Sequence, residues 1–260
     1  SRFLRAIGID VRRKLFAELH NALGGNLEKL VCGSAPLRAE VADFFEDIGI
    51  CVTNGYGITE CSPLVSVNGE FDNDPRTVGH WVDCVDVRID NPNEDGEGEI
   101  CVKGDIVMLG YYKNPEATAE VFTEDGYFCT GDFGKINEKE KIIITGRKKN
   151  IIILGNGKNI YPEELEDYVG GIPYVLENIV YAGRDESGTE NELCVQCIID
   201  PDTLANSDRE ELQKRLKSDV FRALESLPAY KQITKVIIRE EPFVKTTTNK
   251  IKRAKDGSPM

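Results

Sequence analysis

The stretch GYYKNPEATAEVFTEDGYFCTGD spans residues 110–132 and ends in an aspartate that follows a glycine. Its turn cluster TEDGYF precedes the short segment that carries Asp132. We expect Asp132 to lie exposed at a tight turn, where a carboxylate can accept two hydrogen bonds from neighbouring hydroxyls such as those of a ribose. The alternative is an aspartate that stabilises its own turn, and for this motif in isolation the alternative is favoured.

Short apolar strands separated by turns surround this stretch. VDVRI (85–89), GEICVKG (98–104) and KIIITG (141–146) are strand-like, and the cluster NPNEDGEG (91–98) separates the first two. We therefore predict a β-rich subdomain over residues 76–146.

Upstream, residues 1–75 alternate between helical and strand-like segments. Helical spacing covers residues 10–23, and a second helix is expected after Pro36 and before Gly49. Its predicted apolar face is Leu37, Val41, Phe44, Phe45 and Ile48. EKLVCGSA (28–35) and ICVTNGYG (50–57) are expected to be short buried strands that run into glycine-rich turns. This alternation predicts an α/β layer.

Residues 147–260 are expected to form a small α+β domain. Pro162 is predicted at the first turn of a helix, where the helix dipole favours the acidic residues that follow it. Strands are expected at NIVYAG (178–183), LCVQCIID (193–200) and KVIIRE (235–240). A long helix before the last strand is introduced by a capping box, Ser207 with Glu210. Its apolar positions are Leu212, Leu216, Val220, Leu224 and Leu227.

Composition narrows the class of protein. The chain has 260 residues and a net charge of −13, so it should repel nucleic acid, which is also negatively charged. No apolar run in the sequence is long enough to span a membrane. The opening residues lack the apolar core of a secretory signal, so we expect a cytoplasmic protein with free thiols at its eight cysteines. Cys194 and Cys197 lie three apart in a predicted strand and would point to opposite faces. We expect buried structural thiols there rather than a metal or redox site.

The motif NGYGITE, residues 54–60, follows a predicted strand. Gly55 and Gly57 allow a ligand to approach the backbone, and Tyr56 offers a flat face to a base. Thr59 and Glu60 could serve a phosphate and its metal ion. For the motif alone, an ordinary strand-to-loop turn is the more common interpretation.

Two basic segments complete the set of motifs. GRKKN (146–150) lies at the predicted domain boundary, and TTTNKIKR (246–253) lies near the end of the chain. Each of them alone is more often a solvated surface segment.

In this order and spacing, the motifs resemble the adenylate-forming superfamily of acyl-CoA synthetases, luciferases and peptide-synthetase adenylation domains. The resemblance runs from Gly33 to Arg253 and rests on GSAPL (33–37), YGITE, GEICVKG, the stretch 110–132 and GRKKNIIILGNGKNIYPEELE (146–166). It implies the C-terminal part of the adenylate-forming fold: an α/β remnant, a β-rich subdomain and a small mobile α+β domain.

The resemblance assigns a nucleotide site. In the family the position of Tyr56 stacks on adenine, and Asn54 and Gly55 line its exocyclic amine. Asp132 would bind both ribose hydroxyls. The residues that the resemblance assigns to nucleotide or coenzyme binding are Gly33, Ser34, Ala35, Asn54, Gly55, Tyr56, Gly57, Asp132, Arg147 and Gly157.

The resemblance also assigns catalytic residues. Thr59 would touch phosphate, and Glu60 would help to hold Mg²⁺. Lys250 matches the lysine that bridges the substrate carboxylate and the α-phosphate. The family usually has glycine before that lysine, whereas this sequence has Asn249, which tolerates left-handed backbone geometry better than most residues.

Three further positions concern movement and the second half-reaction. Arg147 would contact the ribose or the phosphates. Lys149 would be the hinge about which the C-terminal domain rotates. Gly157 would lie in the loop that lines the tunnel for the thiol.

The implied reaction joins a carboxylic acid to ATP, giving acyl-AMP and pyrophosphate, and then transfers the acyl group to coenzyme A. The substrate is expected to be a medium- or long-chain fatty acid, since GYGITECSPLVSVN (55–68) resembles bacterial fatty acyl-CoA ligases. The alternatives are an aryl or succinylbenzoyl acid–CoA ligase, and a non-catalytic nucleotide-binding or interaction module.

The family also has a phosphate-binding loop rich in Ser, Thr and Gly upstream of the first motif, and no such stretch occurs in these 260 residues. We therefore expect a C-terminal fragment that does not catalyse adenylation by itself. Its exposed strand edges could drive oligomer formation, and peripheral membrane contact stays open for the parent protein.

Overall fold

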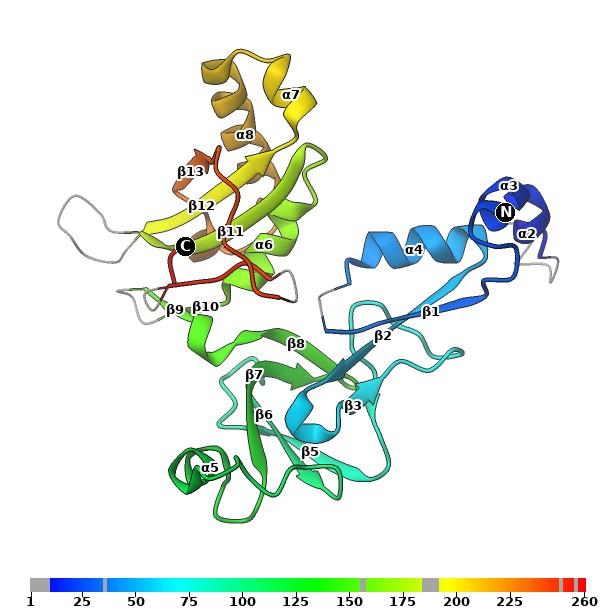
Figure 1. Cartoon of the computed structure of the whole chain (residues 1–260). Helices are drawn as coiled ribbons and strands as arrows, with labels where there is room; N and C mark the ends of the chain where they lie inside the picture. Colours follow the sequence, from blue (N-terminus) through cyan, green and yellow to red (C-terminus); the bar gives the residue numbers. More distant parts are fainter. Residues whose placement is uncertain (1–9, 35–36, 155–157, 184–191, 248–249, 255–256) are drawn as a thin grey trace. The chain divides into compact units, whose positions relative to one another are not determined.

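The computed structural model describes residues 10–34, 37–154, 158–183, 192–247, 250–254 and 257–260. Contacts between residues divide the chain into two units, Ser1–Ile144 and Thr145–Met260 (Figure 1). Each unit has its own hydrophobic cluster of buried side chains. The three-part division with boundaries near residues 75 and 146 stays a prediction.

The first unit begins with a small α/β layer. Its four-stranded sheet has the order β1-β2-β3-β4, with β1 parallel to β2 and the remaining neighbours antiparallel. The elements are α2 (Arg12–Leu15), α3 (Ala17–Ala22), β1 (Lys29–Cys32), α4 (Ala39–Ile48), β2 (Cys51–Gly57), η1 (Thr59–Cys61), β3 (Leu64–Val67) and β4 (His80–Trp81). The helical and strand segments expected upstream are therefore present.

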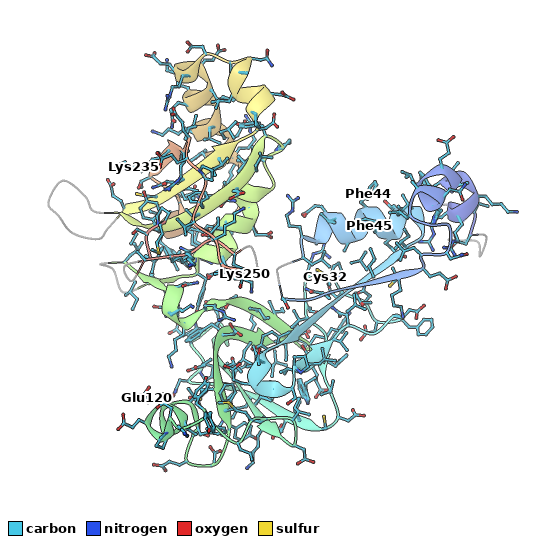
Figure 2. All side chains as sticks on the ribbon, in the orientation of Figure 1. Cys32, Phe44, Phe45, Glu120, Lys235 and Lys250 are labelled. Atoms are coloured by element: carbon cyan, nitrogen blue, oxygen red, sulfur yellow. The ribbon has the colours of Figure 1, made fainter. Side chains whose placement is uncertain are left out.

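Two details of this layer differ from the sequence-based expectation. Strand β2 is buried, but β1 is an edge strand of the sheet and Val31 is 68% exposed. Helix α4 is capped after Ile48 by Gly49, as expected, and the φ of 93° at Gly49 is one that glycine readily adopts. On α4, Ile48 is buried as predicted, whereas Phe44 is exposed and meets Phe45 edge to face (Figure 2). Periodicity identifies the apolar side chains of a helix, but only the packed structure shows which of them are covered.

The second sheet of this unit contains the predicted β-rich region. Its strand order is β5-β6-β7-β8, and β5, β6 and β7 run antiparallel. The elements are β5 (Val85–Asp90), β6 (Gly98–Gly104), α5 (Pro115–Val121), β7 (Phe128–Ile136) and β8 (Ile142–Arg147). Helix α5 begins because Pro115 occupies its first position and the Asn114 side chain accepts a hydrogen bond from the Ala117 amide at 3.1 Å.

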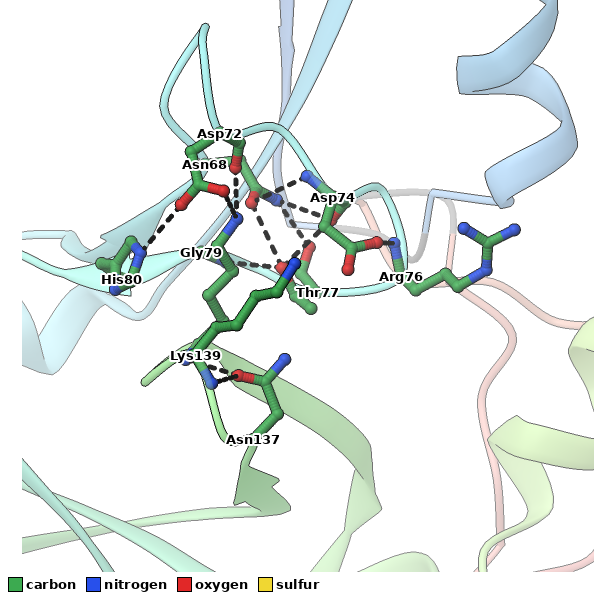
Figure 3. A network of polar contacts seen from close by, with 10 residues as sticks. Asn68, Asp72, Asp74, Arg76, Thr77, Gly79, His80, Asn137 and Lys139 are labelled. Atoms are coloured by element: carbon green, nitrogen blue, oxygen red, sulfur yellow. Dashed lines mark hydrogen bonds and ion pairs between the residues drawn. The ribbon is translucent and has the colours of Figure 1, made fainter.

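A buried lysine ties the loop between β3 and β4 to the second sheet. The Lys141 side chain is 1% exposed, and its Nζ lies 2.9 Å from Asp72 Oδ1 and also donates to the Asp72 carbonyl. The backbones of Val78 and Gly79 exchange hydrogen bonds with Ile142. Figure 3 shows the surrounding network, in which Asp72 also contacts His80 at 3.1 Å. The loop after β3 is thus held by specific polar contacts.

The second unit is an α+β layer. Its three-stranded sheet has the order β11-β12-β13, with β11 antiparallel and β13 parallel to β12. The elements are η2 (Lys148–Asn150), β9 (Ile152–Ile153), β10 (Asn159–Ile160), α6 (Pro162–Gly170), β11 (Val175–Gly183), β12 (Glu192–Ile199), α7 (Pro201–Ala205), α8 (Arg209–Ala223), η3 (Ala229–Lys231) and β13 (Lys235–Ile238). The cluster of buried side chains joins α6 and α8 to the sheet.

Of the two helix starts predicted in this unit, one is confirmed and the other is displaced by one residue. Pro162 is the first residue of α6, as expected. Helix α8 is capped by Asp208 rather than by Ser207, since the Asp208 carboxylate accepts hydrogen bonds from the Glu210 and Glu211 amides at 2.9 and 3.1 Å. A carboxylate and a hydroxyl are both good caps, so the sequence alone did not separate two adjacent candidates.

The two cysteines of β12 are buried, as predicted. Cys194 and Cys197 are 2% and 0% exposed. Burial raises the pKa of the Cys197 thiol to about 12 and also raises that of Cys194, so both remain protonated near neutral pH.

Among the helices that the structure describes, none is both long and apolar enough to cross a membrane.

Candidate functional site

Two segments predicted to bind the nucleotide lie side by side in the first sheet, and NGYG, which was expected to follow a strand, forms the end of strand β2. Strands β1 and β2 are parallel, with Cys32 opposite Asn54, so β1 ends beside the NGYG segment of β2, which itself continues to Gly57. Gly33 and Ser34 follow β1 directly. A Cβ atom at Gly33 would lie 3.6 Å from the Gly55 carbonyl oxygen. The first residues of GSAPL therefore lie beside NGYG, at the carboxyl end of parallel strands where α/β proteins bind ligands.

A hydrogen bond joins β2 to the other sheet of the same unit. The Tyr56 hydroxyl donates to Asp132 Oδ2 at 2.8 Å. Tyr56 lies on β2 and Asp132 on β7, and both side chains are buried, at 7% and 3% exposure. The structure thus places the expected adenine-stacking residue and the expected ribose-binding residue in direct contact.

The buried position of Asp132 corrects the sequence-based expectation of an exposed carboxylate at a tight turn. Asp132 lies inside strand β7, beside an irregularity in the pairing with β6. Gly131 there has a φ of 72°, and its amide donates to Glu99 Oε1 at 3.1 Å. The Asp132 amide donates to Thr130 Oγ1 at 3.1 Å. The Thr-Gly-Asp motif therefore lies where the regular pairing with β6 is interrupted, and such an irregularity can re-aim a side chain without ending the strand.

Burial keeps Tyr56 a proton donor. Desolvation, assisted by the negative charge of Asp132, raises the pKa of the Tyr56 phenol well above its ordinary value of 10.0. The ring packs in the hydrophobic cluster of the first unit with Cys61 and Val65. At neutral pH the phenol therefore remains protonated and holds Asp132 by donating to one of its two oxygens.

The two glycines of the motif NGYG lie where the backbone of a neighbouring segment leaves little room for a side chain. A Cβ atom at Gly57 would lie 1.9 Å from the Pro63 carbonyl oxygen, because the chain returns there to start β3. At Gly55 the Cβ atom would lie 3.2 Å from the Ser66 carbonyl oxygen. Asn54, which precedes them, is 7% exposed. Close backbone packing therefore requires Gly57 whether or not a ligand is present.

The acidic residue of the motif lies in the short helix that follows β2. Thr59 and Glu60 lie in η1, where Thr59 is exposed and Glu60 is half-buried. The Tyr111 hydroxyl donates to Glu60 Oε1 at 3.3 Å, and the Met108 amide donates to the Glu60 carbonyl at 2.8 Å. Residues after β6 thus hold η1 in place.

The described residues contain no cluster of three or more His, Cys, Asp or Glu side chains that could form a metal cage. At nucleotide sites, Mg²⁺ is bound by one or two carboxylates together with the phosphate oxygens. Glu60 fits the role of such a carboxylate.

Sequence reasoning missed two residues of this region. Glu99 fixes Gly131 and lies in GEICVKG, and Tyr111 fixes Glu60 and lies in the stretch 110–132. Both segments had been recognised as motifs, but their roles depend on contacts between strands that a linear pattern does not reveal.

The remaining predicted residues belong to the second unit or lie outside the described residues. Arg147 ends β8 and Lys149 lies in η2, and both are exposed. Lys250 is also exposed. Ala35 and Gly157 lie outside the residues that the structure describes.

Comparison with known proteins identifies this arrangement. Residues 2–112 match the family model described as AMP-binding enzyme. The long-chain-fatty-acid–CoA ligase FadD15 of Mycobacterium bovis is 39% identical over 177 residues, which are 68% of this chain and 28% of that protein. The chain belongs to the adenylate-forming enzyme family. Long-chain-fatty-acid–CoA ligase 5 of Mus musculus is 31% identical over 88% of this chain and 36% of its own length.

Solved structures of adenylate-forming enzymes show the same fold. ATP-bound MatB from Rhodopseudomonas palustris superposes with a TM-score of 0.69 and 30% identity, over 85% of this chain and 43% of that one. The A-PCP didomain of a carboxylic acid reductase from Segniliparus rugosus, in complex with AMP, gives a TM-score of 0.77 and 27% identity over 98% of this chain and 37% of that one. The chain thus spans well under half the length of these adenylate-forming proteins.

Proposed function

We propose that this chain contributes the adenosine-binding and catalytic lysine segments of an ATP-dependent fatty acid–CoA ligase. The acid reacts with ATP to give acyl-AMP and pyrophosphate, and coenzyme A then displaces AMP to give the thioester. The observation that carries the proposal is the contact between Tyr56 and Asp132, on a strand whose NGYG segment lies next to the carboxyl end of β1. The names of the relatives support a long-chain fatty acid as substrate.

In this proposal the first unit holds adenosine. Asp132 Oδ2 accepts the Tyr56 hydroxyl, and because a carboxylate can accept several hydrogen bonds, Asp132 is proposed to accept the ribose hydroxyls as well. Gly33, Ser34, Asn54 and Gly55 supply backbone and amide groups at the same edge of the sheet. Asn54 and Gly55 are proposed to line the exocyclic amine of adenine.

Thr59, Glu60 and Lys250 are proposed to act on the reacting phosphate. Two anions meet when a carboxylate attacks the α-phosphate, so positioning and positive charge supply most of the rate. Lys250 is an exposed point charge on a long stem, suited to follow the charge that develops on the phosphate oxygens. Mg²⁺, held in part by Glu60, would neutralise the departing pyrophosphate.

Lys149 is proposed as the hinge between the two half-reactions, with Arg147 next to it as a contact to the nucleotide. Lys149 lies in the short turn η2, which directly follows β8 and the unit boundary at Thr145. Lys149→Pro would fix φ near −65° and should leave adenylation intact while transfer to coenzyme A fails. If both half-reactions of this variant match the unsubstituted protein, the hinge assignment is wrong.

The test of the function measures pyrophosphate release by the complete gene product with saturated acids of increasing chain length. Acid-dependent release is expected, strongest with medium or long chains, and Asp132→Asn should weaken binding of AMP by at least about tenfold. The 260-residue chain alone is expected to bind AMP weakly and to release no pyrophosphate. Absence of acid-dependent release from the complete protein, with AMP binding intact, would favour a nucleotide-binding module instead.

A further inference from the structure

The segment that carries Lys250 folds back on itself as a small hairpin in the second unit. Lys245 and Ile251 pair as an antiparallel bridge. The Thr246 amide donates to the Lys250 carbonyl at 2.8 Å, and the Lys250 amide donates to Thr246 Oγ1 at 3.1 Å. The Lys252 amide donates to the Val244 carbonyl at 2.8 Å. The backbone around Lys250 is therefore hydrogen-bonded on both sides, while its side chain is exposed (Figure 2).

One arm of the hairpin is anchored by an ion pair. Lys245 Nζ lies 2.6 Å from Glu177 Oε1 on strand β11. Both side chains are about 30% exposed, so water screens this pair only in part. The contact fixes the chain five residues before Lys250.

The other arm is anchored more deeply. Arg253 donates through Nη2 to Glu166 Oε1 on helix α6 and through Nη1 to the Val180 carbonyl on β11 at 2.7 Å. The same Glu166 oxygen accepts the Val180 amide at 2.7 Å. The side chains of Arg253 and Glu166 are 13% and 21% exposed. One guanidinium thus joins the tail to a helix and to the central sheet, three residues after Lys250.

The two acceptors of this anchor make it specific for arginine, because separate nitrogens of one guanidinium reach Glu166 and the Val180 carbonyl. Burial raises the pKa of the Glu166 carboxyl, and the positive charge of Arg253 opposes that shift. A lysine would keep the charge but could not donate to the carboxylate and the carbonyl through one planar fork.

We propose that Arg253, anchored by Glu166, is a positioning residue that fixes the hairpin so that Lys250 is presented in one orientation. The proposal rests on the proposed function, since only that function assigns Lys250 to the reacting phosphate. A misplacement of a catalytic group by about 1 Å can reduce a rate about 100-fold. Loss of the deep anchor should therefore reduce the step that uses Lys250 and leave a step that does not use it.

The first experiment measures hairpin order in the 260-residue chain, independently of any activity. Amide hydrogen exchange is followed for residues 244–254 in the unsubstituted chain, Arg253→Ala, Arg253→Lys and Lys252→Ala. Lys252 is exposed, so its variant is the matched control. Exchange at Lys250 and Lys252 should accelerate at least about tenfold in Arg253→Ala, less in Arg253→Lys, and not in the Lys252 control. Unchanged exchange in Arg253→Ala overturns the proposal.

The second experiment uses the complete protein and separates the half-reactions. Arg253→Ala should lower acid-dependent pyrophosphate exchange by about 10- to 100-fold, while thioester formation from supplied acyl-AMP and coenzyme A stays within about twofold. Arg253→Lys should restore part of the first rate. An equal loss in both half-reactions would mean that Arg253 is merely structural, which overturns the proposal.

Two further variants distinguish a failure of the proposed anchor from a failure of the proposed function. If Lys250→Ala leaves adenylation unchanged, the proposed function fails at that residue, whereas the exchange result still reports on the anchor. If Arg253→Ala does not fold, Glu166→Gln removes the charge pair but keeps an acceptor for the Val180 amide. Glu166→Gln should then show the same loss of adenylation alone, and normal adenylation in it overturns the proposal.

Discussion

Tyr56 and Asp132 are 76 residues apart in the chain, yet the phenol hydroxyl of one donates to the carboxylate of the other at 2.8 Å. The contact joins β2 of the first sheet to β7 of the second within one unit. It therefore has two consequences, one for the stability of this unit and one for the geometry of the proposed adenosine site.

Removal of the Tyr56 hydroxyl should destabilise the first unit. Tyr56→Phe leaves a buried carboxylate with one fewer donor, which costs about 1–3 kcal/mol. The control is Tyr127→Phe, because the Tyr127 hydroxyl donates to Asp86 at an exposed position and its loss should cost well under about 1 kcal/mol. Urea unfolding followed by circular dichroism measures both. Equal free energies of unfolding for the two variants would contradict the role assigned to the buried pair.

The same pair predicts a dependence of stability on alkaline pH. The folded protein raises the pKa of Tyr56 above 10.0, so the folded state keeps a proton that the unfolded state loses above that pH. The stabilisation is present below pH 10 and declines above it, by up to about 1.4 kcal/mol per pH unit for one group. The difference in unfolding free energy between the unsubstituted chain and Tyr56→Phe should shrink from pH 9 to pH 11. A constant difference would mean that folding leaves the pKa of Tyr56 unchanged, and a growing difference would mean that folding lowers this pKa; either result contradicts the prediction.

Gly57 should not tolerate a side chain. In Gly57→Ala the new methyl group would lie 1.9 Å from a backbone oxygen, so β2 and β3 must separate, at a cost of about 1–3 kcal/mol or more. Gly69→Ala is the control, since a Cβ atom there meets nothing within 4 Å. Soluble yield and the midpoint of thermal unfolding compare the two. A Gly57→Ala protein as stable as the control would mean that the motif needs this glycine for ligand access alone.

Lys141 should control the loop that follows β3. Lys141→Met keeps most of the buried stem but removes the ammonium group from Asp72. The hydrogen bond from Lys141 is the main reason that the pKa of Asp72 lies below its ordinary value of 3.8, and His80 contributes less. NMR titration should therefore show the Asp72 pKa rising towards 3.8 in the variant, with the amides of residues 68–79 exchanging faster.

The sign of the accompanying pH effect follows from the direction of that shift. A lowered carboxylate pKa stabilises the fold above about pH 3.8, and this stabilisation is lost as the pH falls through the folded-state pKa. Acid unfolding of Lys141→Met should therefore begin at higher pH than in the unsubstituted chain. Lys139→Met, at the exposed neighbouring turn, is the control and should not move the transition.

The sequence determined the elements and their order. Strands β5, β6 and β8 were predicted from short apolar runs between turn clusters, and α6 from Pro162. Alternation and helix-start signals are local, so a linear reading can detect them. The order and spacing of the motifs likewise predicted the adenylate-forming family.

Tertiary structure decided how individual side chains are placed. Asp132 was expected at an exposed turn and is buried in β7, because its surroundings include Tyr56 from another sheet and Glu99 from the neighbouring strand. Val31 and Phe44 are exposed although their segments are apolar. Arg253 had no assigned role until the fold brought it to Glu166, 87 residues earlier in the chain. Burial and long-range polar contacts depend on residues far apart in sequence, and a local pattern contains no information on which of these will meet.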